Sequence, residues 1–397
     1  MLDYVTVAAT ATNYVFQGDT TYFISGAVAL LGTNTWEGGT VLKFATNAGV
    51  CVERMYDINP QIVFLTKPFL PVICTAKDDN SAGESISGSS GNPSTNYYAN
   101  PALSLYGFTS DPAVANLRIA YAQQGIYVYG LRVTVSDAQF VNCQNGVRLT
   151  GTSLHLRNVL FANTKTNFNS TTTSTTIDAQ NVTFSGSASL ISTAPPSTGI
   201  LLAVTNGLFA NVTIPNTTNV NLSGSYNGFF NTSPFGANSR TNNAYPFMTA
   251  GAGAFYLTNG CTFRNAGTTN MDSSLLADLR QKTTYPPIVY SNTVICADTN
   301  LGPQAQRDTD VPDLGYHYDP LDYLWSCCIS NATLNLTNGV ALAYFDSNGI
   351  WLHNGGHLVS GGSPVQRNYL VHYNLVQEQP MGAGQDSYPG GFLSGRF

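Results

Sequence analysis

The sequence predicts an all-β protein, a parallel β-helix solenoid with loop excursions and one short helix. Three observations lead to this prediction: a scarcity of charge, a composition that favours strands and turns, and an internal repeat. Lys and Arg number 16 and Asp and Glu 22 among 397 residues, which makes 10%, against about 25% in a typical soluble domain. Hydrophobic residues reach 43% and aromatic residues 11%, enough for a large core and unlike a disordered chain.

The repeat is carried by phenylalanine and asparagine. Successive phenylalanines lie 21, 23, 25 and 54 residues apart, and the last interval fits two turns plus an insertion. Asn or Gly follows each Phe by two residues, and in the middle three segments Asn precedes it by three. The phenylalanines are Phe140, Phe161, Phe184, Phe209 and Phe263, and the preceding asparagines are Asn158, Asn181 and Asn206.

A period in the low twenties, with short β-branched strands between turn residues, is typical of a β-solenoid. Helical repeats are excluded, because β-branched residues and Asn dominate each unit. We expect the phenylalanines to stack inside the coil and the asparagines to form hydrogen-bonded ladders at the turns. The scarcity of charge then has a cause, since identical charges on neighbouring coils, about 4.8 Å apart, would repel each other.

The elements follow in order along the chain. We expect a parallel β-helix over 1–325 and, over 326–397, either further coils or a capping segment with a mobile tail. One helix is expected at 271–284, because Asn270 or Asp272 can cap it and Pro286 stops it. Within 1–325 the first coils occupy 1–75, a Gly/Ser/Asn-rich excursion 76–116, the regular coils 117–232, and two insertions 233–250 and 271–287.

Composition also limits the partners and the setting. A formal net charge of −6 without a Lys/Arg run argues against nucleic-acid binding, and no apolar stretch is long enough for membrane insertion. The start of the chain lacks the features of a signal peptide, so we expect either a removed leader or a piece of a longer protein. Seven cysteines leave at least one free thiol or an intermolecular bond.

The Asn-stepped coils resemble the right-handed parallel β-helix of the pectate-lyase-like superfamily. The strings TAKDDNSAGESISGSSGNPS (75–94) and DTDVPDLGYHYDPLDY (308–323) resemble secreted β-helix proteins of environmental bacteria that have no assigned activity. The resemblance implies an extracellular or cell-surface location. The signature strings of pectate lyases, polygalacturonase-like hydrolases and pectin esterases are missing, apart from an isolated Asp78-Asp79 pair in a Gly/Ser loop.

Four basic residues on the regular coils are the candidate catalytic set. Their apolar neighbours point inward, so these side chains should point outward. A polysaccharide lyase removes the proton next to a uronate carboxylate with a basic residue, and arginine can also bind the carboxylate directly. The alternative is a solvated outer face with incidental charges. The residues are Arg132, Arg148, His155 and Arg157, with Asp137 and Asp178 in the same coils.

Two further groups are candidates for binding. Asp308, Asp310 and Asp313 could bind Ca²⁺, although a structural turn is the alternative; no other cofactor is expected. The loop carboxylates Asp78, Asp79 and Glu84 form a weaker candidate of the same kind. Tyrosines in the excursion could stack on sugar rings or simply anchor the loop to the core. They are Tyr97, Tyr98 and Tyr106.

Two functions stay open at the level of sequence. The first is a carbohydrate-binding, structural or adhesive module that acts on a polysaccharide or a cell-envelope surface. The second is a lyase or glycoside hydrolase that acts on an acidic polysaccharide. A complete acid/base set would favour the enzyme, and convergence of Arg132, Arg148 and His155 with an Asp in one groove would supply it.

Overall fold

The computed structural model describes residues 4–93, 96–171, 174–193, 199–215, 219–345 and 349–380. The chain forms two compact units. The first comprises Met1–Pro246, Thr262–Leu276 and Val311–Tyr316, and the second Phe247–Cys261, Ala277–Asp310 and His317–Phe397. The tail expected at the end of the chain lies mostly outside the described residues.

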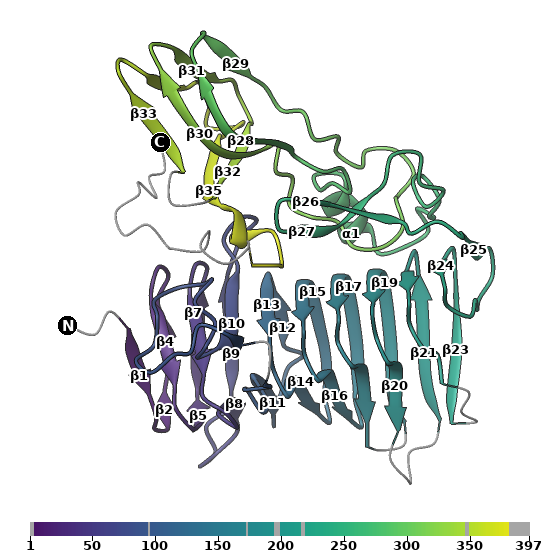
Figure 1. Cartoon of the computed structure of the whole chain (residues 1–397). Helices are drawn as coiled ribbons and strands as arrows, with labels where there is room; N and C mark the ends of the chain where they lie inside the picture. Colours follow the sequence, from purple (N-terminus) through teal and green to yellow (C-terminus); the bar gives the residue numbers. More distant parts are fainter. Residues whose placement is uncertain are drawn as a thin grey trace. The chain divides into compact units, whose positions relative to one another are not determined.

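The first unit is a right-handed parallel β-helix, which confirms the predicted fold class (Figure 1). A three-stranded sheet contains β3 (Val15–Phe16), β6 (Thr33–Glu37) and β9 (Gln61–Leu65). An eight-stranded sheet contains β2 (Ala11–Thr12), β5 (Ala27–Leu31), β8 (Gly49–Glu53), β11 (Leu103–Tyr106), β14 (Gln124–Tyr129), β16 (Asn145–Thr150), β18 (Thr166–Ser170) and β20 (Ser189–Thr193).

The largest sheet of the first unit has fourteen strands. Its main path runs through β1 (Val5–Val7), β4 (Thr21–Ile24), β7 (Val41–Phe44), β10 (Val72–Ala76), β13 (Leu117–Ala120), β15 (Arg132–Val141), β17 (Ser153–Ala162), β19 (Thr176–Ser185), β22 (Leu208–Ala210), β24 (Gly228–Phe230) and β25 (Arg240–Thr241). Off this path, β12 (Ala113–Ala115) pairs with β15, and β21 (Ile200–Thr205) pairs with β19 and β23 (Val220–Ser225). The excursion expected over 76–116 therefore returns to the coils at β11.

The predicted phenylalanine stack fills the interior of the regular coils. Phe140, Phe161, Phe184 and Phe209 are fully buried, and their ring centroids lie 4.7, 5.2 and 4.9 Å apart along the series. The next ring is Phe229, 5.1 Å from Phe209, which occupies the turn that the sequence pattern left unassigned between Phe209 and Phe263. Phe263 lies beyond the stack, against Gly228, where a Cβ would come within 2.9 Å of its ring.

The asparagines form the expected turns. At the bend inside β15, β17 and β19, Asp137, Asn158 and Asn181 have φ values of 51°, 54° and 52°, a left-handed conformation that Asn and Asp tolerate better than other residues. Asn158 Nδ2 donates to Asp137 Oδ1 at 2.7 Å, and Asn206 Nδ2 donates to Asn181 Oδ1 at 3.2 Å. These coils thus turn at one residue, and at two of the steps the side chain of that residue bonds to the neighbouring coil.

The predicted helix is present but shorter. Helix α1 spans Ser273–Leu279, and Asp272 caps it by accepting hydrogen bonds from the backbone N–H groups of Ser274 and Leu275 at 2.9 and 3.2 Å. Of the two caps that the sequence allowed, the structure uses Asp272. No helix in the described ranges is long and apolar enough to cross a membrane.

The second unit contains a shorter parallel stack with its own core around Trp325, Leu334 and Leu342. Position 325, where the sequence suggested a division, lies within β30. One sheet contains β28 (Ile288–Ile295), β30 (Tyr323–Ser330), β32 (Ala341–Tyr344), β33 (Ile350–His353) and β35 (Tyr369–His372), and the other β29 (Thr299–Leu301), β31 (Thr333–Leu336) and β34 (His357–Ser360). The hairpin of β26 (Phe247–Ala250) and β27 (Gly253–Leu257) and a 3-10 turn, Tyr373–Leu375, complete this unit.

Candidate functional site

The four basic candidates lie on two different faces of the first unit. Arg132 is on β15, and His155 and Arg157 are on β17, in the fourteen-stranded sheet. Arg148 is on β16, in the eight-stranded sheet. The single groove that would have favoured an enzyme is therefore not formed by this set, because the chain turns a corner between β15 and β16.

His155 and Arg157 belong to an ion-pair cluster with two carboxylates. Arg157 Nη2 lies 2.6 Å from Asp178 Oδ2, and its Nε lies 3.7 Å from Asp272 Oδ2. His155 Nδ1 lies 3.3 Å from the same Asp178 oxygen. The parallel register explains the meeting, since His155 pairs with Asp178 on the neighbouring strand β19.

The cluster has a structural use, because Asp272 is also the cap of α1. A hydrogen bond from the Ser274 hydroxyl, with further help from backbone N–H groups and Arg157, keeps the pKa of Asp272 below its usual value against the effect of burial. Arg157 is thus a cation between two carboxylates, an arrangement suited to fixing α1. Arg132 is exposed, two positions before Thr134, the register partner of His155.

The second face carries Arg148 among tyrosines. Tyr127 pairs in register with Arg148, and the guanidinium carbon lies 4.9 Å from the centre of the Tyr127 ring. Tyr106 pairs with Tyr129, and their ring centroids are 5.1 Å apart. We call Tyr106, Tyr127, Tyr129 and Arg148 the tyrosine face.

The side chains of the tyrosine face point away from the core. The residues that alternate with them, Leu105, Val128 and Leu149, are fully buried, whereas Tyr106 and Tyr129 are each 43% exposed. Within the described residues Arg148 makes no ion pair, and its Nε is buried without a hydrogen-bond partner. The face therefore offers a cation and exposed rings side by side, the combination that binds the flat faces and acidic groups of organic ligands.

Sequence reasoning missed Tyr127 and Tyr129, although a signal for them exists. In QGIYVY the apolar Ile126 and Val128 point inward, so the tyrosines between and after them must point outward. The offset of 21 residues from Phe140 to Phe161 also separates Tyr127 from Arg148. The repeat that predicted the core could thus have placed this pair on one face.

The other two tyrosine candidates do not join this face. Tyr98 is 2% exposed and donates its hydroxyl hydrogen to Asp78 Oδ2 at 2.6 Å; burial, with Asp78 as the second cause, raises the pKa of Tyr98 to about 12. The structure thus gives Tyr98 the anchoring role and removes it from the sugar-stacking candidates. Tyr97 is half-buried, with Lys165 Nζ 5.2 Å from its ring centre.

The loop carboxylates also act as anchors. Asp79 Oδ2 accepts a hydrogen bond of 2.5 Å from Thr75, and its Oδ1 accepts bonds from Ser81. Lys43 Nζ donates to the backbone carbonyl of Asp79 at 2.7 Å, and the backbone N–H of Glu84 donates to the Thr21 hydroxyl. These bonds attach the start of the excursion to β4, β7 and β10.

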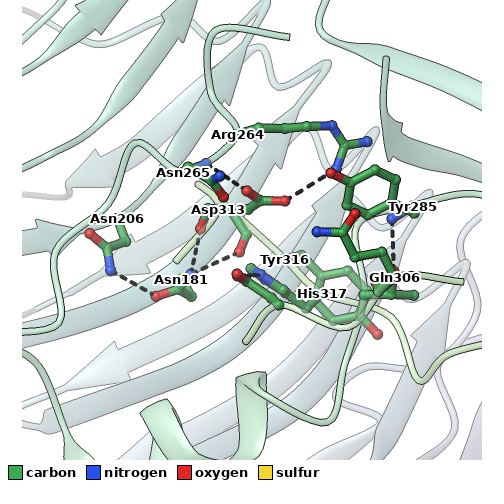
Figure 2. A network of polar contacts seen from close by, with 12 residues as sticks. Asn181, Asn206, Arg264, Asn265, Tyr285, Gln306, Asp313, Tyr316 and His317 are labelled. Carbon is green, nitrogen blue, oxygen red and sulfur yellow. Dashed lines mark hydrogen bonds and ion pairs between the residues drawn. The ribbon is translucent and has the colours of Figure 1, made fainter. Parts of the chain in front are cut away.

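The three calcium candidates are divided between the two units. In the first unit, Asp313 Oδ2 pairs with Arg264 at 3.2 Å, and its Oδ1 accepts the backbone N–H of Asn265 at 2.7 Å (Figure 2). In the second unit, Asp308 Oδ2 lies 2.6 Å from His317 Nε2, and Asp310 is exposed. Both buried carboxylates therefore have partners inside their own units, and calcium binding stays a prediction.

Figure 2 also shows how the segment with Asp313 is bound to the coils. Asn181 Nδ2 donates to the backbone carbonyls of Asp313 and Gly315 at 3.0 and 3.3 Å, and the backbone N–H of Tyr316 donates to Thr183 at 2.8 Å. The string DTDVPDLGYHYDP contributes here to structure, through a strap laid on the outer side of β19.

Comparison with known proteins adds little to this geometry. No protein-family model matches the chain, and no curated protein matches it. Among solved structures, a mutant of AlyGC, an alginate lyase of the PL6 family, is similar at 12% identity and a TM-score of 0.27, over 93% of this chain and 71% of that one. The fold defines the chain as a right-handed parallel β-helix protein.

Proposed function

We propose that the protein is a secreted or cell-surface module that binds an acidic polysaccharide, and that the tyrosine face is its binding site. The observation that carries this proposal is the juxtaposition of two exposed tyrosine rings, 5.1 Å apart, with an arginine that has no carboxylate partner among the described residues. Aromatic rings stack on the apolar faces of sugars, and arginine binds carboxylates with two parallel hydrogen bonds.

The position of Arg148 strengthens the proposal. The ring of Tyr127 lies against the guanidinium and orients it, and the cation–π attraction does not consume its hydrogen-bond donors. A ligand carboxylate can therefore pair with a side chain that is already positioned, which lowers the entropy lost on binding. A neutral glycan would use the rings but would gain nothing from the charge.

The enzymatic alternative, a lyase or glycoside hydrolase, has less support. The basic candidates are divided between two faces, and Arg157 is paired with two carboxylates. Incubation with polygalacturonate or alginate tests this alternative: the appearance of unsaturated or reducing chain ends would establish an enzyme and overturn the module.

The binding proposal is tested with matched charge variants. We expect Arg148→Gln to weaken binding to polygalacturonate or alginate about tenfold or more, because a hydrogen bond to a charged group contributes about 1.5–3 kcal/mol. Arg132→Gln is the control, since it removes the same charge from an outward strand position on the other face. Affinity electrophoresis or calorimetry gives the ratio of the dissociation constants of variant and wild type. Dextran serves as the neutral glycan for comparison.

A second variant examines the rings. Tyr129→Ala should weaken binding severalfold for acidic glycans, because it removes a half-exposed aromatic contact while leaving the inward residues Val128 and Leu149 in place. Equal affinities for the wild type, Arg148→Gln and Tyr129→Ala would show that this face does not bind these glycans.

A further inference from the structure

A short turn beside the tyrosine face presents another tyrosine to solvent. The turn comprises residues 55–58 and follows β8; Met55 and Ile58 form an isolated antiparallel bridge, and the Ile58 N–H donates to the Met55 carbonyl at 3.0 Å. Tyr56, at its tip, is 83% exposed, the second highest value among the exposed large hydrophobic residues of the described chain. Within those residues Tyr56 has no hydrogen bond or ring contact. Its exposure therefore has no explanation among the contacts of the described residues.

The backbone of the turn is unusual for the residues that occupy it. Tyr56 and Asp57 have φ values of 52° and 62°, so both central residues are left-handed. Turns of this type strongly prefer Asn-Gly or Asp-Gly, because other side chains raise the energy of that conformation. A bulky aromatic residue kept in such a position, and fully presented to solvent, points to a role for its ring outside the fold.

The turn is fixed next to the tyrosine face. The Arg54 backbone N–H donates to the carbonyl of Tyr106 at 3.3 Å, and a Cβ on Gly107 would come within 2.8 Å of the Arg54 Cβ. Gly107 has a φ of +71°, which lets the chain leave β11 without touching Arg54. The turn therefore leaves β8 at the corner where Tyr106 and Tyr129 end their own strands.

Register positions on neighbouring strands of the sheet form a line across these coils. Glu53 pairs in register with Tyr106, and Tyr106 with Tyr129, which pairs with Thr150. Each step is one strand spacing, about 4.8 Å. The turn follows β8, which neighbours β11 on the side away from Arg148, so Tyr56 belongs to the coil next to that of Tyr106 and lies three residues after Glu53.

On the basis of the binding function proposed above, we propose that Tyr56 is a further sugar-binding residue of the same site. The bound polysaccharide runs along the solenoid axis, with an acidic group at Arg148, sugar rings at Tyr129 and Tyr106, and a more distant ring at Tyr56. Chain length is therefore the property that Tyr56 recognises, because a short oligosaccharide bound at Arg148 does not reach the turn.

The test uses the full chain and oligogalacturonates of graded length, with alginate oligosaccharides as a second series. Tyr56→Asn removes the ring and suits the left-handed backbone, so the turn should persist, and Tyr56→Trp retains an aromatic contact. We expect Tyr56→Asn to weaken binding about fivefold or more for the longest chains and less than about twofold for the shortest. Tyr56→Trp should restore the dependence on chain length.

The reference variant Tyr129→Ala separates the two proposals. If Tyr129→Ala weakens binding but Tyr56→Asn leaves the affinity unchanged for oligosaccharides of every length, the role of Tyr56 is wrong and the proposed binding function stands. If Tyr56→Asn weakens binding equally for oligosaccharides of every length, the proposal that Tyr56 makes binding depend on chain length is also overturned. If neither variant differs from the wild type, or if the wild type binds no member of either series, both proposals are overturned.

Discussion

Lys43 shows what burial does to a single ionisable side chain. It lies on β7, is completely buried, and donates to the carbonyl of Asp79. Burial lowers the pKa of Lys43 from 10.5 to about 8, although the negative charges of Asp79 and Glu84 act in the opposite direction. The cost of burying the ammonium group away from water therefore outweighs its attraction to these two carboxylates.

This shift predicts a pH dependence of stability. Below pH 8 the folded state carries the full cost of the buried charge; between about pH 8 and 10.5 the unfolded state binds more protons, so the contribution of Lys43 to stability rises with pH by up to about 3 kcal/mol. Lys43→Met should remove this rise. Urea unfolding of both proteins at pH 7.5 and 9.5 checks it, and parallel pH profiles would contradict the assignment.

At the scale of elements, much of the architecture follows from the sequence, because coil stacking depends on local periodicity. The interval from Phe140 to Phe161 and the asparagines at the bends are local signals, and both could be recognised in the sequence. Phe229 was missed because Tyr226 occupies the bend where most earlier coils have Asn. Asn231, two residues after Phe229, does match the repeat.

The candidate site was less predictable for a physical reason. Alternation shows that Arg148 and Arg157 point outward, but not which charges they meet. Asp272, which pairs with Arg157, comes from an insertion far along the chain, and no periodicity connects the two. Contacts between coils repeat with the sequence, whereas contacts between a coil and an insertion do not.

The phenylalanine stack yields a stability prediction. Phe184 contacts rings on both sides, at 5.2 and 4.9 Å, so Phe184→Ala should lower the free energy of unfolding by about 3–5 kcal/mol, the usual cost of removing a buried ring. Phe263→Ala is the control outside the stack; this ring is equally buried but has no ring contact within the described residues, so its loss should cost less. Denaturant unfolding followed by circular dichroism gives the difference, and equal costs would argue against the stacked core.

The helix cap gives a prediction at the same scale. Asp272→Ala removes the cap of α1 and the contact with Arg157, and we expect a loss of about 1 kcal/mol. Asp272→Asn keeps the cap but removes the charge, so it should recover most of that loss, since the ion pair is half-exposed. Thermal unfolding measures both; an Asn variant as unstable as the Ala variant would show that the charge, and not the cap, is what matters.

At the scale of the whole molecule, the charge distribution opposes the proposed ligand. The net charge is −6, so a polyanion approaches against a weak long-range repulsion. Binding then depends on short-range contacts at Arg148 and the tyrosines, which act only after the ligand has reached the face. Specificity for the ligand then comes from these short-range contacts and not from long-range electrostatic attraction.

This balance predicts an unusual salt dependence. Raising the ionic strength from 0.01 to 0.15 M shortens the Debye length from about 30 to 8 Å, which screens the repulsion more than the contact with Arg148. The association rate for polygalacturonate should therefore rise with salt, whereas the dissociation rate should rise only slightly. Surface plasmon resonance at the two salt concentrations measures both rates. An association rate that falls with salt would contradict the prediction and indicate a positively charged binding surface.

The coils have one more consequence, which concerns how such a protein can change over generations. The central coils share a buried phenylalanine, and most of them have an asparagine at the bend. A duplication of the 21 residues between Phe140 and Phe161 would therefore insert an extra layer whose contacts already exist on both sides. Each such duplication would lengthen the outer face by one strand. The length of ligand that the face can contact would therefore change in steps of one coil.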